Sequence, residues 1–235
     1  MLKPDDLRSF CQDFYGYGEQ SAPHWFISME EGGGTSEPEI QMRLDAWISR
    51  GRRELEDAGE YHDAIHLGKW FASHPPIQRT WSASIRMLLI FGGVQPTTER
   101  VREYQRTTLG RKGGVSRLSP LFPLPAKSID HWHYGEWTDD NDFSNRRSYR
   151  KFLERVRTRH LSEQIRQFAP RTVVFYGQSY MEYWHAVAGL QFTHISDGFA
   201  IAKNVGTRFV ICKHPAVQGI TNEYFETIGR RLAAA

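Results

Sequence analysis

The feature that most constrains the fold is an alternation between short apolar segments and longer segments with helical spacing. Strands are predicted at residues 25–28, 115–122, 172–176 and 208–212, with an irregular strand or hairpin at 191–202. Apolar strands of this kind are covered by helices on both faces of a parallel sheet. The sequence therefore predicts an α/β fold, a three-layer αβα sandwich with a short, mainly parallel central sheet.

Helical spacing predicts the cover for both faces. Trp81, Ile85 and Leu88 share one side of a predicted helix at 79–91, which Gly92 ends. Further helices are predicted near the N-terminus and at 38–56, 61–73, 97–108, 148–168, 180–188 and 218–234. In the 148–168 helix we expect the apolar residues to be buried and the arginines to face solvent. No repeat or linker interrupts this order, so residues 1–235 are predicted to form a single domain.

Cysteine content excludes two kinds of metal centre. Only Cys11 and Cys212 are present, which is too few for an iron–sulfur cluster or a four-cysteine zinc site. Two isolated cysteines are typical of a reducing compartment, and the N-terminus lacks the apolar core of a signal peptide. No run of residues is long enough to span a bilayer. We therefore expect a cytoplasmic protein with no metal, no other cofactor and no membrane partner.

The charge is mildly basic in total but unevenly distributed. The formal net charge is +3, residues 30–63 carry ten acids against four Lys or Arg, and residues 145–159 carry seven Lys or Arg against Glu154 alone. Such segregation can form a basic face that binds a polyanion. A charge run is, however, more often a solvated helix surface.

Two adjacent carboxylates and three glycines follow the first predicted strand. Glu30 and Glu31 come after the strand at 25–28, and Gly32–Gly34 come next. Glycines leave the backbone open to close approach, and ligands of open α/β sheets bind at the carboxyl ends of strands. Adjacent glutamates in this position also occur as helix-entry or solvated loop residues. The pair is therefore a candidate site that needs a second feature.

Two other predicted strands end in residues of the same kind. The proline-rich Ser119–Pro125 loop follows the second strand, and His214 with Pro215 follows the last one. Carboxyl ends of parallel strands emerge on one side of a sheet, so we expect a carboxylate and an imidazole to face one pocket.

At these positions the sequence resembles the uracil-DNA glycosylase superfamily. Its members place an acidic or amide residue after the first strand, in a Gly-x-Asp-Pro or Gly-x-Asn-Pro-Gly type motif, which Ser28-Met29-Glu30-Glu31-Gly32 matches in position. They place a His-Pro-Ser loop after the last strand, which His214-Pro215-Ala216 matches. The resemblance follows the αβα order over most of the chain. It implies the fold of that superfamily and a base-flipping enzyme that hydrolyses an N-glycosidic bond in DNA.

The resemblance also implies roles for the matched residues. Glu30 stabilises the cationic sugar or positions water, and His214 stabilises the departing base. Glu31, at the family's usual proline, is the alternative acid if the register differs by one residue. The expected partner is DNA with a flipped nucleotide, and no protein partner is expected.

Departures from the family pattern indicate a larger base than uracil. Gly32 replaces the tyrosine that excludes a substituent at pyrimidine C5, and Ser119 stands where relatives carry a base-reading asparagine. The stacking aromatic after the acid is absent, and Trp47 is the nearest substitute. We expect a bulky 5-modified pyrimidine, as in some phage genomes, with pocket contacts from an aromatic insertion at 129–145. The predicted base-binding residues are Met29, Gly32, Trp47, Ser119, Phe122 and Trp132.

Other residues are predicted to bind the DNA backbone. Backbone amides and a helix start are expected to contact phosphates, and the loop at 213–221 is expected to enter the vacated base stack. These residues are Gly33, Gly34, Gln178, Ser179, Lys213, Val217 and Gln218. Arg111, Lys112, Arg117 and Lys127 are expected to add salt-sensitive affinity.

Three functions remain open at this stage. The first is a DNA glycosylase for a modified or damaged pyrimidine, with a role in antiphage defence that some members of the superfamily have. The second is a catalytically silent DNA-binding module, since the asparagine of the second motif is lost. The third is a small-molecule nucleoside hydrolase, which also uses a carboxylate.

His131 and His133 with the nearby aspartates fit no standard metal-ligand spacing, and we expect a surface loop there.

Overall fold

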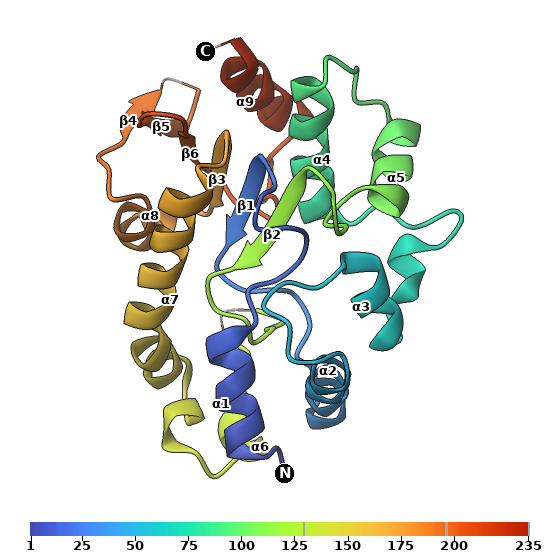
Figure 1. Cartoon of the computed structure of the whole chain (residues 1–235), viewed down its shortest axis with the longest axis vertical. Helices are drawn as coiled ribbons and strands as arrows, with labels where there is room; N and C mark the ends of the chain where they lie inside the picture. Colours follow the sequence, from blue (N-terminus) through green and yellow to red (C-terminus); the bar gives the residue numbers. More distant parts are fainter. Residues whose placement is uncertain (129, 196, 235) are drawn as a thin grey trace.

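A mixed, mostly parallel sheet forms the centre of the molecule in a computed structural model that describes residues 1–128, 130–195 and 197–234. Its strands are β1 (His24–Ser28), β2 (Ser116–Pro120), β3 (Thr172–Tyr176), β4 (Thr193–Ile195), β5 (Phe199–Lys203) and β6 (Arg208–Cys212). Their order across the sheet is β2-β1-β3-β6-β5-β4 (Figure 1). Strands β2, β1, β3 and β6 are parallel, whereas β5 and β4 are antiparallel to their neighbours.

Helices connect the strands and surround the sheet (Figure 1). They are α1 (Pro4–Asp13), α2 (Glu37–Ser49), α3 (Ala58–Ala64), α4 (Arg79–Phe91), α5 (Thr98–Thr107), α6 (Tyr134–Trp137), α7 (Arg146–Phe168), α8 (Met181–Ala188) and α9 (Asn222–Ala234). Short 3-10 turns are η1 (Gly68–Phe71), η2 (Asn141–Phe143) and η3 (Gln178–Tyr180). None of the helices in the described ranges combines the length and the apolarity needed to cross a membrane.

Adjacent residues of β3 show that helices cover both faces of the sheet. Side chains of consecutive strand residues point to opposite faces. Phe175 stacks on Trp184 of α8 with ring centroids 5.0 Å apart. Tyr176 points the other way, where its hydroxyl hydrogen-bonds to that of Ser84 of α4 over 2.8 Å and its ring meets Phe225 of α9. The predicted α/β class is therefore confirmed, and the arrangement is compatible with three layers.

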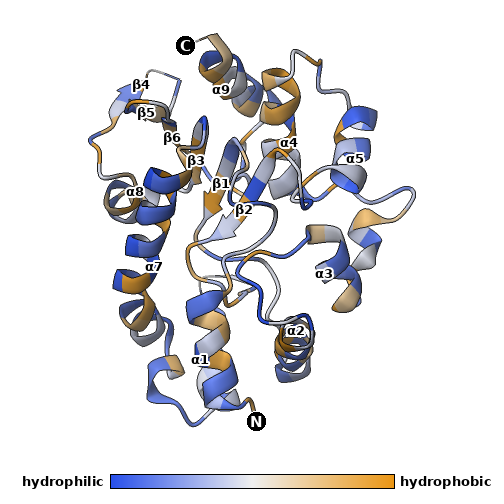
Figure 2. Cartoon of the chain, viewed as in Figure 1, coloured by the Kyte–Doolittle hydropathy of each residue, from blue (hydrophilic) through white to orange (hydrophobic). Residues whose placement is uncertain are grey.

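The buried residues of the strands explain why the strands could be predicted from the sequence. Hydrophobic residues lie within β1 and β3 (Figure 2), and all five residues of β3 are buried. Strand β2 differs, because Ser116, Arg117 and Ser119 are buried as well. The guanidinium of Arg117 lies over the Trp25 ring at 4.1 Å and donates to the Ser119 hydroxyl. The expectation that Arg117 adds surface affinity for DNA is therefore wrong.

Two predicted helices end earlier than their apolar spacing indicates. The helix expected at 38–56 stops at Ser49, and Gly51 and Arg52 follow with positive φ. The Trp47 indole N–H donates to the backbone carbonyl of Arg53, which fixes this reversal. The helix expected at 61–73 divides into α3 and η1 around His66, whose φ is also positive. A left-handed residue ends a helix whatever the hydrophobic pattern beyond it.

The long helix α7 confirms the predicted element but not its predicted faces. Arg157 is fully buried and donates to the carbonyls of Cys11 and Pro120. Its guanidinium also lies 3.9 Å from the centre of the Tyr15 ring. Val156, which was expected inside, is 49% exposed. One arginine of α7 therefore connects the last turn of α1 to the end of β2.

Candidate active-site cleft at the carboxyl ends of the parallel strands

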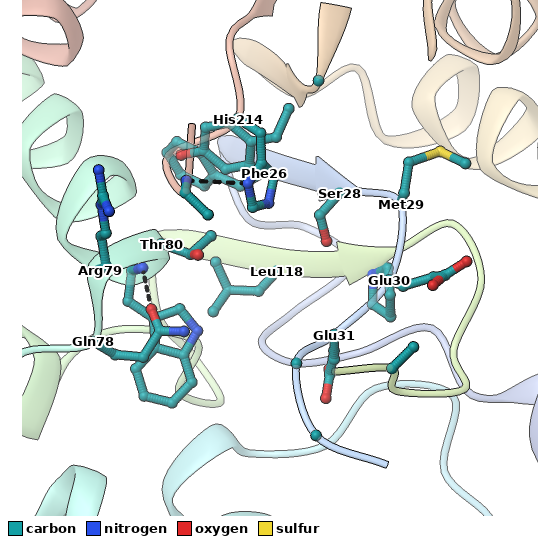
Figure 3. Close-up of a pocket in the computed structure, with 18 of the residues that line it drawn as sticks. Phe26, Ser28, Met29, Glu30, Glu31, Gln78, Arg79, Thr80, Leu118 and His214 are labelled. Atoms are coloured by element: carbon teal, nitrogen blue, oxygen red, sulfur yellow. Dashed lines mark hydrogen bonds between the residues drawn. The ribbon is translucent and has the colours of Figure 1, made fainter. Parts of the chain in front are cut away.

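A cleft of about 1450 Å³ opens where the four parallel strands end. It receives Glu30 and Glu31 from beyond β1, Ser119 from β2 and His214 from beyond β6. In Figure 3, Ser28 and Leu118 lie in the middle, the two glutamates lie on one side, and Gln78, Arg79 and Thr80 lie on the other. The carboxylates and the imidazole therefore line one cleft at the same edge of the sheet, as predicted.

Two arginines of α7 form ion pairs with Glu30. Its carboxylate forms ion pairs with Arg146 and, at 2.9 Å, with Arg150, and its side chain is 10% exposed. The Arg146 guanidinium also donates to the carbonyls of Ser128 and His131. A carboxylate held by two guanidiniums has little capacity left to bind water or a sugar. Glu30 therefore ties the strand end to α7 and to the loop before it.

Glu31 lies beside it with fewer partners. One oxygen accepts a hydrogen bond from the Tyr17 hydroxyl over 3.1 Å, and the nearest guanidinium nitrogen, from Arg43, is 3.6 Å away. Burial raises the pKa of the Glu31 carboxyl, although Arg43 and the Tyr17 hydroxyl both act to lower it. Perturbed carboxyl groups in clefts are candidates for acid–base or electrostatic roles. Of the two acids, Glu31 has the properties expected of a reactive group.

The three glycines have different environments. A Cβ atom on Gly32 meets no atom within 4 Å, so the cleft is open there. A Cβ on Gly33 comes within 2.8 Å of a Glu39 carboxylate oxygen, and one on Gly34 comes within 2.1 Å of the Pro125 carbonyl oxygen. Both have positive φ, which glycine adopts without strain. Gly33 and Gly34 are therefore needed for close packing.

The Gly34 amide already has an anionic partner. It donates to Glu39 over 3.0 Å, and the Thr35 amide donates to the same carboxylate. A phosphate at this turn would replace that acid or be repelled by it. The expected phosphate contact at Gly34 is therefore wrong, and Gly33, although it lines the cleft, lies beside the same carboxylate.

His214 faces the cleft with a defined tautomer (Figure 3). The Ala216 backbone N–H donates to its Nδ1 over 3.1 Å, so Nδ1 is unprotonated and the neutral ring carries its proton on Nε2. Burial lowers the pKa of His214, and the positive charge of Arg79 acts in the same direction. At neutral pH the ring is therefore an uncharged hydrogen-bond donor.

Only part of the predicted base-binding set reaches the cleft. Met29, Gly32 and Ser119 line it. Trp47 and Phe122 are fully buried, so the predicted base contacts of both residues are wrong. Trp47 packs on Phe10, and Phe122 packs on Tyr149. Trp47 is predicted from its distance along the chain after the acid, and core packing places both side chains outside the lining of the cleft.

The aromatic insertion packs on α7. Trp132 lies against Tyr149, its indole N–H donates to the Phe143 carbonyl, and Arg146 lies over its ring. It does not line the cleft, so the predicted base contact of Trp132 is wrong in this structure. His131 and His133 contact each other ring to ring, and among the described residues no group of three or more potential ligands is arranged to hold a metal ion. Residue 129 of the insertion lies outside the described residues.

The predicted DNA-backbone contacts lie mostly at the cleft. Gln178, Ser179, Lys213 and Val217 line it, whereas Gln218 is exposed on the same loop just beyond the lining. Val217 is 47% exposed. Of the general basic residues, Lys127 lines the cleft, but Arg111 pairs with Asp57 at 2.5 Å and the Lys112 amide donates to the same carboxylate.

Sequence reasoning missed the wall opposite the glutamates. The start of α4 and the segment before it contribute Lys69, Trp70, Gln78, Arg79, Thr80 and Trp81, and α3 contributes His62. Arg79 donates to the Val217 carbonyl over 3.2 Å and so anchors the loop that carries His214. These residues follow no strand, so their position in the sequence carries no signal of a site.

The cleft is rich in cations. Lys and Arg contribute seven of its lining residues and Asp and Glu contribute four. Arg43, Arg146 and Arg150 pair with the acids of the site, whereas Lys69, Arg79, Lys127 and Lys213 have exposed side chains at its rim. The exposed cations at the rim favour an anionic ligand.

The chain matches no protein-family model and no curated protein. The chemistry of this cleft therefore has to be argued from its own residues.

Proposed function

We propose that this protein is a DNA glycosylase with the fold of the uracil-DNA glycosylase superfamily, acting on a flipped-out pyrimidine with a substituent at C5. The observation that carries the proposal is the placement of an ionisable carboxylate, Glu31, and a neutral imidazole, His214, in one cleft at the carboxyl ends of parallel strands. The resemblance at Ser28–Gly32 and His214–Ala216 supports the fold assignment, as does the parallel order β2-β1-β3-β6.

The two groups suit the charges that develop during cleavage of an N-glycosidic bond. The sugar becomes positive and the departing base becomes negative. In Figure 3, Glu31 and His214 lie on opposite sides of Ser28, so one can face the sugar while the other faces the base. The carboxylate of Glu31 stabilises the cation and orients the attacking water. The Nε2–H of His214 donates to the oxygen of the base on which negative charge accumulates.

The assignment of Glu31 as the catalytic carboxylate differs from the register that the sequence favours. Glu30 has two guanidiniums on its carboxylate, whereas Glu31 has one neutral hydroxyl and a more distant guanidinium. A preorganised but incompletely satisfied carboxylate responds more strongly to a new positive charge. Glu30 then serves as the anchor that holds the strand end.

The open space beside Gly32 supports a large base. The cleft exceeds the roughly 300–1,000 Å³ of ordinary small-molecule sites, so a flipped nucleotide leaves room for a substituent. Large 5-substituents are a feature of some phage genomes, and excision of such bases would damage the invading DNA. Defence against phage is the role that fits this substrate.

The rim supports binding of a nucleic acid strand. Lys69, Arg79, Lys127 and Lys213 provide exposed cations for phosphates, with affinity that falls as salt rises. Val217 projects from the loop that Arg79 anchors and is the apolar group placed to enter the base stack.

Incubation with phage DNA containing 5-substituted cytosines, followed by alkali, tests the proposal. Strand breaks at the modified positions are expected with the wild-type protein, and unmodified DNA of the same sequence provides the control. Salt-sensitive DNA binding without abasic sites would identify a silent DNA-binding module instead. Base release from free nucleosides but not from DNA would identify a nucleoside hydrolase.

A further inference from the structure

An aromatic recess adjoins Glu31, and only its Tyr17 hydroxyl has a part in the chemistry proposed above. The residues that form this recess are Tyr17, His62, Leu67, Trp70, Ile77 and Trp81, and all of them line the cleft. The centre of the His62 ring lies 5.1 Å from that of Tyr17 and 5.2 Å from that of Trp81, to which it is nearly perpendicular. Tyr17 connects the two regions, because its hydroxyl donates to Glu31. A flat ring system placed near Glu31 therefore has aromatic walls on this side.

His62 contributes a hydrogen-bond acceptor to the recess. Its Nδ1 lies 2.7 Å from the backbone carbonyl oxygen of Ala58. A carbonyl oxygen only accepts, so Nδ1 carries the proton and Nε2 of the neutral ring is an acceptor. Burial lowers the pKa of His62 to about 4, which keeps the ring uncharged at neutral pH. No hydrogen bond to Nε2 is found within the part of the chain that the structure describes, and Nε2 is not among the fully buried unpaired polar atoms there, so it is partly accessible to a ligand.

The geometry points to His62 as a specificity-determining residue whose Nε2 accepts a hydrogen bond from the exocyclic amine of a flipped cytosine-type base. This inference rests on the proposed glycosylase function. An amine donates to Nε2, whereas the 4-keto oxygen of a uracil-type base would place a second acceptor against it. A site built to bond a donor rejects the analogue that lacks it, because its own polar group is then buried without a partner. The recess therefore selects amino-pyrimidines.

A purely structural role for His62 makes a different prediction. The bond from Nδ1 to Ala58 lies within α3 and stabilises that helix whether or not a base is bound. Loss of it would lower the melting temperature and slow excision of every base alike. Selection by Nε2 instead changes the ratio between two bases that differ only at the 4-position.

Two variants separate the two ring nitrogens. In His62→Asn, the side-chain amide N–H takes the place of Nδ1–H and keeps the bond to Ala58, but the acceptor is lost. In His62→Gln, the longer side chain carries an acceptor to the place of Nε2, and the bond to Ala58 is lost. Single-turnover excision is measured on duplexes with one 5-hydroxymethylcytosine, 5-hydroxymethyluracil or 5-methylcytosine.

The wild type is expected to prefer 5-hydroxymethylcytosine over 5-hydroxymethyluracil. His62→Asn should reduce that ratio by about tenfold, and His62→Gln should keep most of it. An unchanged ratio in His62→Asn, in a wild type that excises, overturns the inference alone. Equal losses on both hydroxymethyl bases, with 5-methylcytosine unaffected, would identify the substituent hydroxyl as the donor and also overturn it. A wild type that releases none of the bases overturns the proposed function and this inference together.

Discussion

The phenolic hydroxyl of Tyr17 donates a 3.1 Å hydrogen bond to the carboxylate of Glu31. Tyr17 is itself fixed to the sheet, since its backbone N–H and carbonyl both bond to Leu118 of β2, over 2.8 and 2.9 Å. Burial has the largest effect on the pKa of Glu31 and Arg43 the next, and Tyr17 adds a hydrogen bond from a residue whose position the central sheet determines. The partner of the Glu31 carboxylate is therefore held in place by the fold.

Replacement of Tyr17 by Phe should shift the pH dependence of excision. The hydroxyl favours the ionised form of Glu31, so its removal raises a pKa that burial already holds above the usual value. The proposed reaction needs the carboxylate, so activity should be lost as the pH falls through its pKa. The acidic limb of kcat/KM should therefore move to higher pH in Tyr17→Phe, as measured between pH 5 and 9. If the acidic limb stays at its wild-type position, the ionisation of Glu31 does not determine the rate of excision.

A tyrosine at position 32 should restrict the size of the base. No atom lies within 4 Å of a Cβ at Gly32, and its φ is not positive, so Gly32→Tyr should fold normally. Its ring would occupy the space proposed for a 5-substituent. Excision of a bulky 5-substituted cytosine should fall at least tenfold relative to the wild type, in line with the roughly 10- to 200-fold discrimination that pocket size provides. Equal rates in the two proteins would show that the substituent lies elsewhere.

Gly34→Ala provides the matched contrast at the neighbouring turn. Its Cβ would come within 2.1 Å of the Pro125 carbonyl oxygen, at a φ of +69° that alanine adopts only with strain. The variant should lose on the order of 1–3 kcal/mol of stability. Thermal unfolding of the two glycine variants side by side should show a lower midpoint for Gly34→Ala only.

Loss of the Glu30 carboxylate should destabilise the protein. In Glu30→Gln, Arg146 and Arg150 keep their positive charges without the shared anion, in an environment that leaves 13% and 21% of their side chains exposed. The expected loss is about 2 kcal/mol, which lowers the melting midpoint by roughly 4–8 °C in a chain of this size. Arg159→Gln is the control, because its pair with Glu163 is solvent-exposed and contributes little. Equal midpoints in the two variants would refute the anchoring role of Glu30.

His24 should make the fold sensitive to acid. Burial, assisted by the charge of Arg171, lowers the pKa of His24 to about 4, and its Nδ1 hydrogen-bonds to the Thr172 hydroxyl. The unfolded chain binds the proton near pH 6.5, so stability is present above that pH and is lost as the pH falls from about 6.5 toward 4, by up to about 1.4 kcal/mol per pH unit. Urea unfolding of His24→Asn over this range should show a shallower decline than the wild type.

Regular elements of this fold follow from local pattern. The strand predicted at 208–212 and the helix predicted at 79–91 are observed with those bounds, because their apolar spacing and their terminating residues agree. The placement of Glu31 and His214 in one cleft was also predictable, since parallel strands end on one side of a sheet.

The rest depends on partners that are remote in sequence. Arg157 looks like a surface residue of an amphipathic helix, yet it is buried on backbone carbonyls near Cys11 and Pro120. Glu30 looks like the more reactive of two acids until Arg146 and Arg150 are placed against it. The sequence does not predict His62 as a site residue, because only the folded structure shows that α3 reaches the cleft.

The central claim is that Glu31 is the catalytic carboxylate of a DNA glycosylase. Single-turnover excision of a 5-substituted cytosine from duplex DNA, with wild type, Glu31→Gln and Glu30→Gln compared below their melting temperatures, tests it directly. The account predicts a loss of at least about 100-fold in Glu31→Gln and a loss of less than about tenfold in folded Glu30→Gln. Wild-type rates in Glu31→Gln together with an inactive Glu30→Gln would contradict it.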